Sequence, residues 1–167
     1  MKYKLSDICD YVKGKTEVAE LNKHSYISTE NMIPNKGGVS EATNLPTTLQ
    51  TQIYLNGDTL VSNIRPYFKK IWKARNEGGC SNDVLVFRAK KGISPDFLYY
   101  VLADDAFFQY AMSTSKGTKM PRGDKTSIMQ YSISKFDYNT QCKIASVLKC
   151  LDNRIEQNTA INENLAA

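Results

Sequence analysis

The sequence has little histidine, and its four cysteines lie far apart. His24 is the only histidine, and Cys9, Cys80, Cys142 and Cys150 form no C-x-x-C pair. Structural zinc sites usually combine cysteines at that short spacing with further cysteines or histidines. We therefore expect reduced, structural thiols and no metal site.

Motifs of common catalytic chemistry are also missing. The sequence contains no G-x-x-x-x-G-K-[ST] phosphate loop, no G-x-G-x-x-G turn and no G-x-S-x-G nucleophile elbow. An adenine methyltransferase would need a glycine-containing cofactor motif and an Asn-Pro-Pro-aromatic type of element, and neither occurs. We therefore expect no catalytic residues and no cofactor bound by this chain.

Three acidic residues come closest to a magnesium-dependent nuclease site. Asp96 follows Pro95, and Asp104 and Asp105 come later. Asp96 stands where the positive end of a helix dipole favours an acid, and the other two lie within the same predicted helix. A structural role is the better interpretation, and the chain is not expected to be an enzyme.

No run of about 18 apolar residues occurs, so no segment is expected to cross a bilayer. The opening stretch, MKYKLSDICDYVKGK, has no signal-peptide core, and we expect a cytoplasmic protein. Hydrophobic residues make up 41% of the sequence and charged residues 23%, a balance that can close a globular core. A length of 167 residues suits one compact domain with an appendage.

Positive charge is concentrated in two segments. Residues 61–91 hold eight basic and two acidic side chains, and residues 116–135 hold five basic and one acidic. This clustering indicates a surface that binds a polyanion, although basic clusters also serve solubility. Within SNIRPYFKKIWKAR, where aromatic and basic residues are interleaved, we expect Phe68 and Ile71 to point toward the core.

The alternation of strand and turn signals predicts a mixed α/β (α+β) domain. Short strands are expected at 59–64 and 67–74, and the apolar run DVLVFRA at 83–89 is expected to form a central strand. A last strand is expected within 128–133.

Two helices are expected before the C-terminal segment. One is short and covers 4–14, and the other covers 94–112, with Ser94 as its cap and Pro95 at its first position. The stretch that follows, 113–127, is a long loop rich in basic residues, and loops of this length are often functional.

The C-terminal segment has a heptad rhythm. Intervals of four and three residues separate seven positions: Ile144, Leu148, Leu151, Ile155, Asn158, Asn162 and Leu165. This spacing predicts a projecting coiled-coil helix with one seam that faces a partner. Buried asparagines would set the register of such a pair, whereas at a helix end in water they would have no such role.

Five segments carry a family likeness over nearly the whole chain. In order they are NGDTLVSNIRPYFKKIW, GGCSNDVLVFR, SPDFLYYVL, GTKMPRGDK and QCKIASVLKCLDNRIEQNTAINENL. Together they resemble the specificity subunits of type I restriction–modification systems. The resemblance implies a DNA-binding target recognition domain at 1–139, followed at 140–167 by one conserved spacer helix for dimerisation and methyltransferase docking.

The same resemblance implies a division of labour between subunits. Methyltransferase (modification) subunits, which bring S-adenosylmethionine, and a restriction subunit would methylate and cleave the DNA. This chain would read one part of a split target in double-stranded DNA and direct them. The alternative function is a stand-alone dimeric DNA-binding regulator without restriction partners.

The sequence departs from the family pattern in two places. A second recognition domain is absent, and KFDYNTQ lacks the proline-rich approach usually seen before the glutamine. We therefore expect a half-size subunit that forms a homodimer through its C-terminal helix. A truncated two-domain subunit is the other interpretation.

Nine basic residues are the candidates for DNA contact. They are Arg65, Lys69, Lys70, Lys73, Arg75, Lys116, Lys119, Arg122 and Lys125. The loop SKGTKMPRGDK is expected to enter a groove. Lysines suit contacts to phosphates. Arg122, between Pro121 and Gly123, has a planar guanidinium group that suits paired hydrogen bonds to a base edge.

Overall fold

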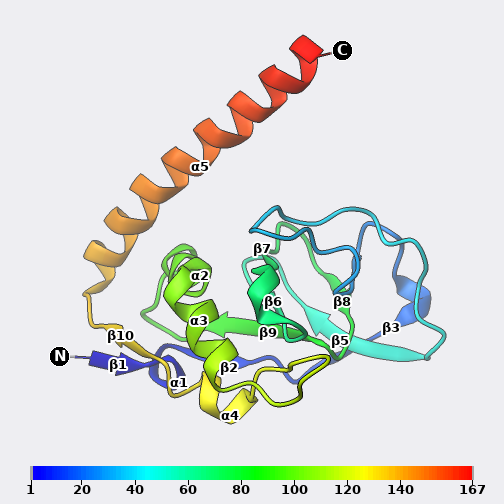
Figure 1. Ribbon diagram of the computed structural model, residues 1–167, viewed down its shortest axis with the longest axis horizontal. Helices are drawn as coiled ribbons and strands as arrows, with labels where there is room; N and C mark the ends of the chain where they lie inside the picture. Colours follow the sequence, from blue (N-terminus) through cyan, green and yellow to red (C-terminus); the bar gives the residue numbers. More distant parts are fainter. Residues whose placement is uncertain (1, 167) are drawn as a thin grey trace.

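In the computed structural model, which describes residues 2–166, strand β9 (Val84–Ala89) runs through the middle of the domain (Figure 1). It lies between β2 (Cys9–Tyr11) and β6 (Thr59–Ser62), and β7 (Ile71–Lys73) pairs with the far side of β6. All three pairings are antiparallel. The first four residues of β9 are buried, so the predicted central strand is confirmed.

The two faces of this sheet pack into two separate cores. Successive side chains of a strand point to opposite faces, so Leu85 and Phe87 lie in one core and Val84 and Val86 in the other. Helices and helical turns contribute to the first core: α1 (Leu5–Ile8), α2 (Pro95–Ala103), α3 (Asp105–Ser113) and α4 (Lys125–Ile128).

The second core includes residues of a second sheet. Its strands, in spatial order, are β3 (Lys15–Glu17), β5 (Gln50–Tyr54), β8 (Gly78–Cys80) and β4 (Tyr26–Ile27). Strand β4 runs parallel to β8, and the other neighbours are antiparallel. The turn η1 (Val18–Glu20) follows β3, and a separate pair joins β1 (Lys2–Lys4) to β10 (Ser132–Ser134).

The helix predicted at 94–112 is divided in two. Ser94 caps α2 as expected, since its hydroxyl accepts a hydrogen bond from the amide of Phe97. Asp104 then leaves the helical backbone at ψ 137°, and its carboxylate accepts the amide N–H of Ala106 at 2.9 Å. An aspartate that caps a new helix ends the preceding one, which sequence periodicity did not reveal.

The prediction of a helix over 4–14 is wrong except for one turn. The turn α1 is flanked by β1 and β2, and β2 pairs with β9 through Cys9↔Ala89, Asp10↔Arg88 and Tyr11↔Phe87. Pairing with the central sheet satisfies the backbone groups of β2 at long range, so tertiary contacts override the local helical signal.

Helix α5 (Tyr138–Ala166) begins two residues before the expected boundary at 140 and leads away from the domain (Figure 1). Its first turns are packed against the domain, where Gln141 and Ala145 are buried. The Gln141 amide accepts the N–H of Ser94 at 3.0 Å and donates to the carbonyl of Phe136 at 2.9 Å. No helix within residues 2–166 has the length and apolarity that crossing a membrane requires.

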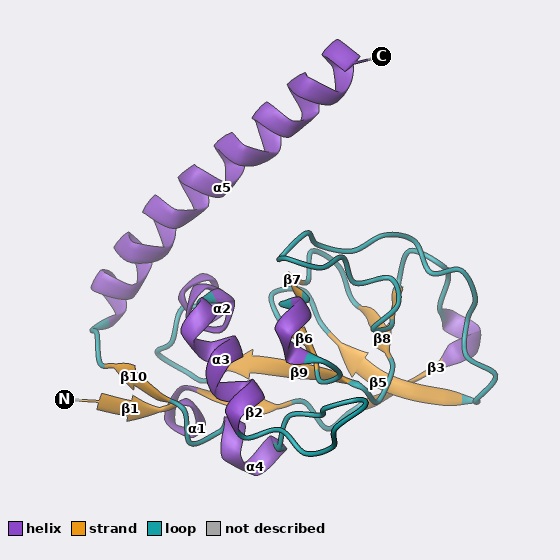
Figure 2. Cartoon of the chain, viewed as in Figure 1, coloured by secondary structure: helices purple, strands orange, loops and turns teal. Residues whose placement is uncertain are grey.

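Two long stretches lack regular structure, residues 28–49 and 114–124, and both appear as extended teal segments in Figure 2. The second lies within the loop expected at 113–127. The first connects β4 to β5, and the second connects α3 to α4.

One buried carboxylate ties the start of β6 to β9. Asp58 is 3% exposed and accepts hydrogen bonds from Arg88 at 2.8 and 2.7 Å, and from the amide of Leu55 at 2.8 Å. These hydrogen bonds raise the pKa of the Arg88 guanidinium. Because a desolvated carboxylate without hydrogen-bond donors is costly, these donors are needed for the stability of the folded chain.

We expect Asp58→Ala to lower the free energy of unfolding by roughly 2 kcal/mol, because it removes the hydrogen bonds that this buried carboxylate accepts from Arg88, which is 43% exposed, and from Leu55. Urea denaturation at pH 7 would measure the loss. Asp10→Ala is the matched control, since Asp10 is exposed and pairs with Lys90 at 3.3 Å; it should cost less than about 1 kcal/mol. Equal losses in the two variants would contradict the structural role of Asp58.

Candidate nucleic-acid interface

The link between β6 and β7 is a tight turn, η2 (Pro66–Phe68). Arg65 before it and Lys69 after it have φ values of 49° and 51°, a left-handed backbone that residues other than glycine seldom adopt. The amide of Lys69 donates to the carbonyl of Pro66 at 2.9 Å and closes the turn. A strained turn of this kind persists because its surroundings hold it.

A segment of the 28–49 stretch supplies part of that support. The amides of Asn35 and Lys36 donate to the carbonyls of Phe68 and Lys69, each at 2.8 Å. The ammonium groups of Lys36 and Lys69 both lie 2.9 Å from the carboxylate of Asp105, at the start of α3. Hydrogen bonds from these two lysines lower the pKa of Asp105 to about 2.

The basic loop at 115–124 folds back on itself beside η2. Lys116 and Arg122 exchange two backbone hydrogen bonds of 2.9 Å, and Gly117 permits the turn between them with φ 94°. The amide of Arg65 donates to the carbonyl of Pro121 at 2.8 Å. The two basic segments of the sequence therefore meet at their backbones.

The cations of this loop are partly paired within the chain. The Lys116 ammonium lies 2.8 Å from the carboxylate of Asp124, and that hydrogen bond, with one from the amide of Ser127, holds the pKa of Asp124 well below its ordinary value. The guanidinium of Arg122 lies 3.2 Å from the carboxylate of Asp83. Lys119, at the tip of the loop, is exposed.

We call the resulting patch the basic surface. It comprises Lys36, Arg65, Lys69, Lys70, Lys116, Lys119, Arg122 and Lys125. The fold thus brings together seven of the nine predicted residues and adds Lys36. Sequence reasoning missed Lys36 because it stands in a polar loop with no basic or aromatic neighbours nearby in the sequence.

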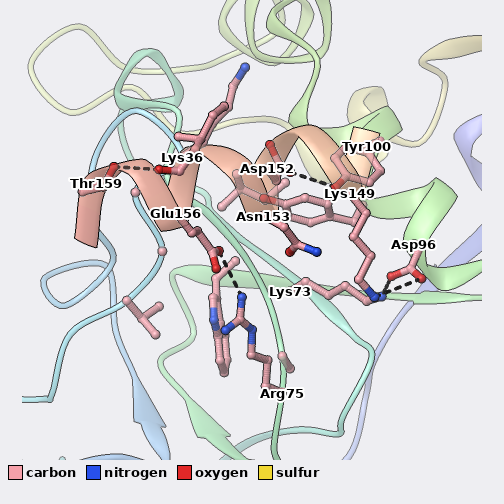
Figure 3. A pocket seen from close by; sticks show the side chains of 18 of the residues that line it. Lys36, Lys73, Arg75, Asp96, Tyr100, Lys149, Asp152, Asn153, Glu156 and Thr159 are labelled. Atoms are coloured by element: carbon pink, nitrogen blue, oxygen red, sulfur yellow. Dashed lines mark hydrogen bonds and ion pairs between the residues drawn. The ribbon is translucent and has the colours of Figure 1, made fainter. Parts of the chain in front are cut away.

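Lys73 and Arg75 lie elsewhere, in a cleft of about 840 Å³ between α5 and the domain (Figure 3). The Lys73 ammonium pairs with Asp96, and burial together with the nearby Lys149 lowers the pKa of Lys73. The Arg75 guanidinium lies 3.2 Å from the carboxylate of Glu156 on α5. Lys36 also lines this cleft, so the cleft adjoins the basic surface, but Lys73 and Arg75 form their ion pairs inside the cleft.

Polar residues form the side of α5 that faces the cleft. Lys149, Asp152, Glu156, Thr159 and Glu163 line it at steps of three or four residues, so they share one helix face. The hydroxyl of Tyr100 on α2 donates to the Asp152 carboxylate at 2.8 Å. Figure 3 shows Asp152 and Glu156 reaching from the helix to partners on the domain.

The heptad seam lies on another side of α5. Four of its apolar members are strongly exposed within the described chain: Leu148 at 36%, Leu151 at 54%, Ile155 at 62% and Leu165 at 81%. Ile155 is the seam residue that also lines the cleft. The seam therefore presents an apolar stripe that residues 2–166 leave mostly uncovered.

The expectation that Phe68 points toward the core is wrong, whereas that for Ile71 is confirmed. Ile71 is fully buried, but Phe68 is 37% exposed and the neighbouring Tyr67 is 47% exposed. The alternation of an extended strand does not apply, because η2 interrupts the strand at Pro66.

Comparison with known proteins decides the family. The family model described as type I restriction modification DNA specificity domain matches residues 1–167. The chain belongs to this family. It is 27% identical over 173 residues to the type I restriction enzyme HindI specificity subunit of Haemophilus influenzae, an alignment that covers 98% of this chain and 38% of that protein.

Solved structures of this family share the fold. The HsdS subunit from Thermoanaerobacter tengcongensis superposes with a TM-score of 0.69 at 18% identity, over 94% of this chain and 43% of that one. A chain from a study of complex assembly and conformational transition of the type I R-M system gives a TM-score of 0.73 at 17% identity, over 96% and 44%. This specificity domain therefore spans less than half the length of each relative.

Two of the four cysteines of this specificity domain lie in its cores, as expected of structural thiols, whereas Cys142 is partly exposed and Cys150 is exposed. Cys9 and Cys80 are buried, and burial raises the pKa of each thiol to about 12. All four cysteines are free. Within residues 2–166, no three histidine, cysteine or acidic side chains are grouped so that they could hold a metal ion.

The low pKa of Asp105 makes the support of η2 sensitive to acid. The folded-state value, about 2, lies below the ordinary 3.8. The carboxylate therefore stabilises the folded chain above pH 3.8, and this contribution is lost as the pH falls toward 2. Asp105→Asn should lower the melting temperature at pH 7 and lower it less at pH 3.

Thermal unfolding of wild type and variant at both pH values measures this difference. Glu163→Gln, on the exposed part of α5, is a control that should leave the melting temperature unchanged at pH 7. A loss for Asp105→Asn that is as large at pH 3 as at pH 7 would refute the assignment.

Proposed function

We propose that this chain is the DNA-recognition part of a type I restriction–modification specificity subunit and that it binds double-stranded DNA through the basic surface. In this proposal residues 1–139 read one part of a split target. Methylation and cleavage are the work of separate subunits, and the chain acts in the cytoplasm. It supplies none of the reactive groups itself.

The observation that carries the proposal is the convergence of two basic segments on one surface. Seven cations come from three loops joined by backbone contacts such as that between Arg65 and Pro121, and the eighth, Lys125, begins α4. Duplex DNA is a polyanion whose phosphates are neutralised by such clusters, with release of counterions. The loops are held by backbone hydrogen bonds, so the cations are positioned before DNA arrives.

The cations of the basic surface have different roles in this proposal. Lys119 is exposed at a loop tip and suits a phosphate. Lys70, which follows η2 and donates to the carbonyl of Thr29 at 2.6 Å, is given the same role. Arg122 is oriented by Asp83, and its guanidinium suits paired hydrogen bonds to a base edge. Lys73 and Arg75 are assigned to the cleft and not to DNA, because Lys73 pairs with Asp96 on α2 and Arg75 pairs with Glu156 on α5.

Partners follow from the division of labour. We propose that methyltransferase subunits, which carry S-adenosylmethionine, and a restriction subunit assemble with this chain, and that residues 140–167 act as the spacer helix on which they dock. The buried Gln141 fixes the base of α5 on α2, and the polar contacts of the cleft fix its direction. Such a helix sets a distance between recognition domains.

The uncovered seam of α5 is proposed to pair with the same helix of a second copy. The stripe of Leu148, Leu151, Ile155 and Leu165 has the heptad spacing of a two-helix contact. Asn158 and Asn162 fall on the same seam and would fix its register. A twofold pair would place two recognition domains on one split site.

DNA binding by the purified chain tests the proposed function. We expect affinity for duplex DNA that falls steeply with salt, and we expect Lys119→Ala and Lys70→Ala to weaken all sequences and reduce the salt slope by about 1 each. Arg122→Ala should instead cost about 1–3 kcal/mol on a duplex selected from a random pool and less on random DNA.

Fluorescence anisotropy at several salt concentrations measures both effects. Lys143→Ala is the matched control, because Lys143 is an exposed lysine on α5 away from the basic surface. Absence of duplex binding at low salt would refute the proposed function. Equal losses for Arg122→Ala on selected and random DNA would refute its role at a base.

Self-association through the seam is tested by Leu151→Asp, which places a charge in the proposed contact. We expect the wild type to sediment as a dimer at micromolar concentration and the variant as a monomer. Asn153→Asp adds the same charge on the cleft side of α5 and should leave the dimer intact. A wild-type monomer under these conditions would exclude the pairing.

A further inference from the structure

Two aromatic side chains stand exposed in the middle of the basic surface. Tyr67 is 47% exposed and Phe68 is 37% exposed, and their ring centroids are 4.7 Å apart at an angle of 51°. Met120, at the tip of the neighbouring loop, is 46% exposed. Single exposed apolar residues are common on protein surfaces and need no explanation. An adjacent pair of exposed aromatic rings surrounded by cations is less common and indicates a binding site.

The turn that carries the pair is held rigidly from both sides. Arg65 and Lys69 bracket it in left-handed conformations, and Pro66 restricts the backbone between them. Backbone hydrogen bonds tie it to Pro121 on one side and to Asn35 and Lys36 on the other, as described above. Strain that is maintained in this way is concentrated at functional sites in proteins, and here it fixes the two rings outward.

The charges around the rings indicate what they contact. The Lys70 ammonium lies 5.8 Å from the centre of the Phe68 ring, and the Lys69 ammonium approaches Asp105 beside the same turn. The Arg65 Nε is buried and has no hydrogen-bond partner among the described residues. Aromatic faces flanked by cations match a base step flanked by its two phosphates.

We propose that Tyr67 and Phe68 form a wedge that enters the base stack of the duplex at one step, while the surrounding cations hold the adjacent phosphates. This inference rests on the proposed function and deepens it. The wedge adds specificity without hydrogen bonds, because steps that unstack at low cost, such as TA and CA, accept it more readily than stiff ones. Arg122 and the wedge thus read different properties of the same site.

The experiment uses the whole chain and a duplex selected from a random pool, with 2-aminopurine placed at successive positions. Unstacking raises 2-aminopurine fluorescence, so wild type should raise it at one step. Tyr67→Ala and Phe68→Ala should abolish the rise and weaken binding by about tenfold or more, with an unchanged salt slope. Tyr67→Phe and Phe68→Tyr keep a ring and should preserve the signal.

Tyr138→Ala is the matched control, because Tyr138 is 53% exposed at the base of α5, away from η2. This variant should match wild type in duplex affinity and in the rise of 2-aminopurine fluorescence. Circular dichroism of each variant shows whether the fold is retained, and the ring-preserving variants give a second measurement should an alanine variant unfold.

The failures of the wedge and of the proposed function have different signatures. The wedge is refuted, and DNA recognition stands, if wild type binds duplex without raising 2-aminopurine fluorescence at any position. The same conclusion follows if the alanine variants match wild type in both affinity and fluorescence. If wild type binds no duplex and instead binds polyglutamate in a Tyr67-dependent manner, the surface docks an acidic protein, and both proposals fail.

Discussion

Burial of β9 on both faces is the constraint from which the rest of the structure follows. A strand covered on two sides needs helices on one face and a second layer on the other, and Phe87 and Val86 belong to those two cores. Strand β6 lies beside β9, is equally buried and pairs antiparallel with β7, so the chain reverses direction between β6 and β7. That reversal is η2, and its position at the edge of the sheet makes it available to a ligand.

The basic surface depends more on backbone hydrogen bonds than on its side chains. The contacts of Arg65 with Pro121 and of Lys36 with Lys69 join three loops before any charge is considered. Asp83, Asp105 and Asp124 then lie among the cations, which lowers repulsion between them. If the basic surface binds DNA as proposed, its preorganised loops lose less entropy on binding than flexible loops would.

Helix α5 has two sides with separate tasks. Polar contacts such as Tyr100 with Asp152 and Arg75 with Glu156 direct it relative to the domain, while most of its apolar seam is exposed. At 29 residues the helix is about 43 Å long. Gln141 anchors one end of the helix inside the domain through hydrogen bonds with Ser94 and Phe136.

The sequence by itself determined the features that depend on local pattern. The apolar run of β9, the Ser94 cap, the heptad spacing of α5 and the family were all predicted, because strand burial, capping and helix faces have short-range signatures. The mixed α/β class followed from the same signals, and the solved relatives share that fold. The general location of the basic segments was also visible as charge.

Only the tertiary structure decided how those segments are divided. Lys69 and Lys73 are four residues apart, yet Lys69 lies on the basic surface and Lys73 in the cleft. Lys69 closes η2 and pairs with Asp105, whereas Lys73 ends the edge strand β7 and pairs with Asp96. Asp104 divides the predicted helix because it caps α3, and Phe68 is exposed because η2 interrupts the strand. The spacing of apolar residues in the sequence indicates neither feature. Which side chains share a surface depends on contacts between distant segments, and those exist only once the chain has folded.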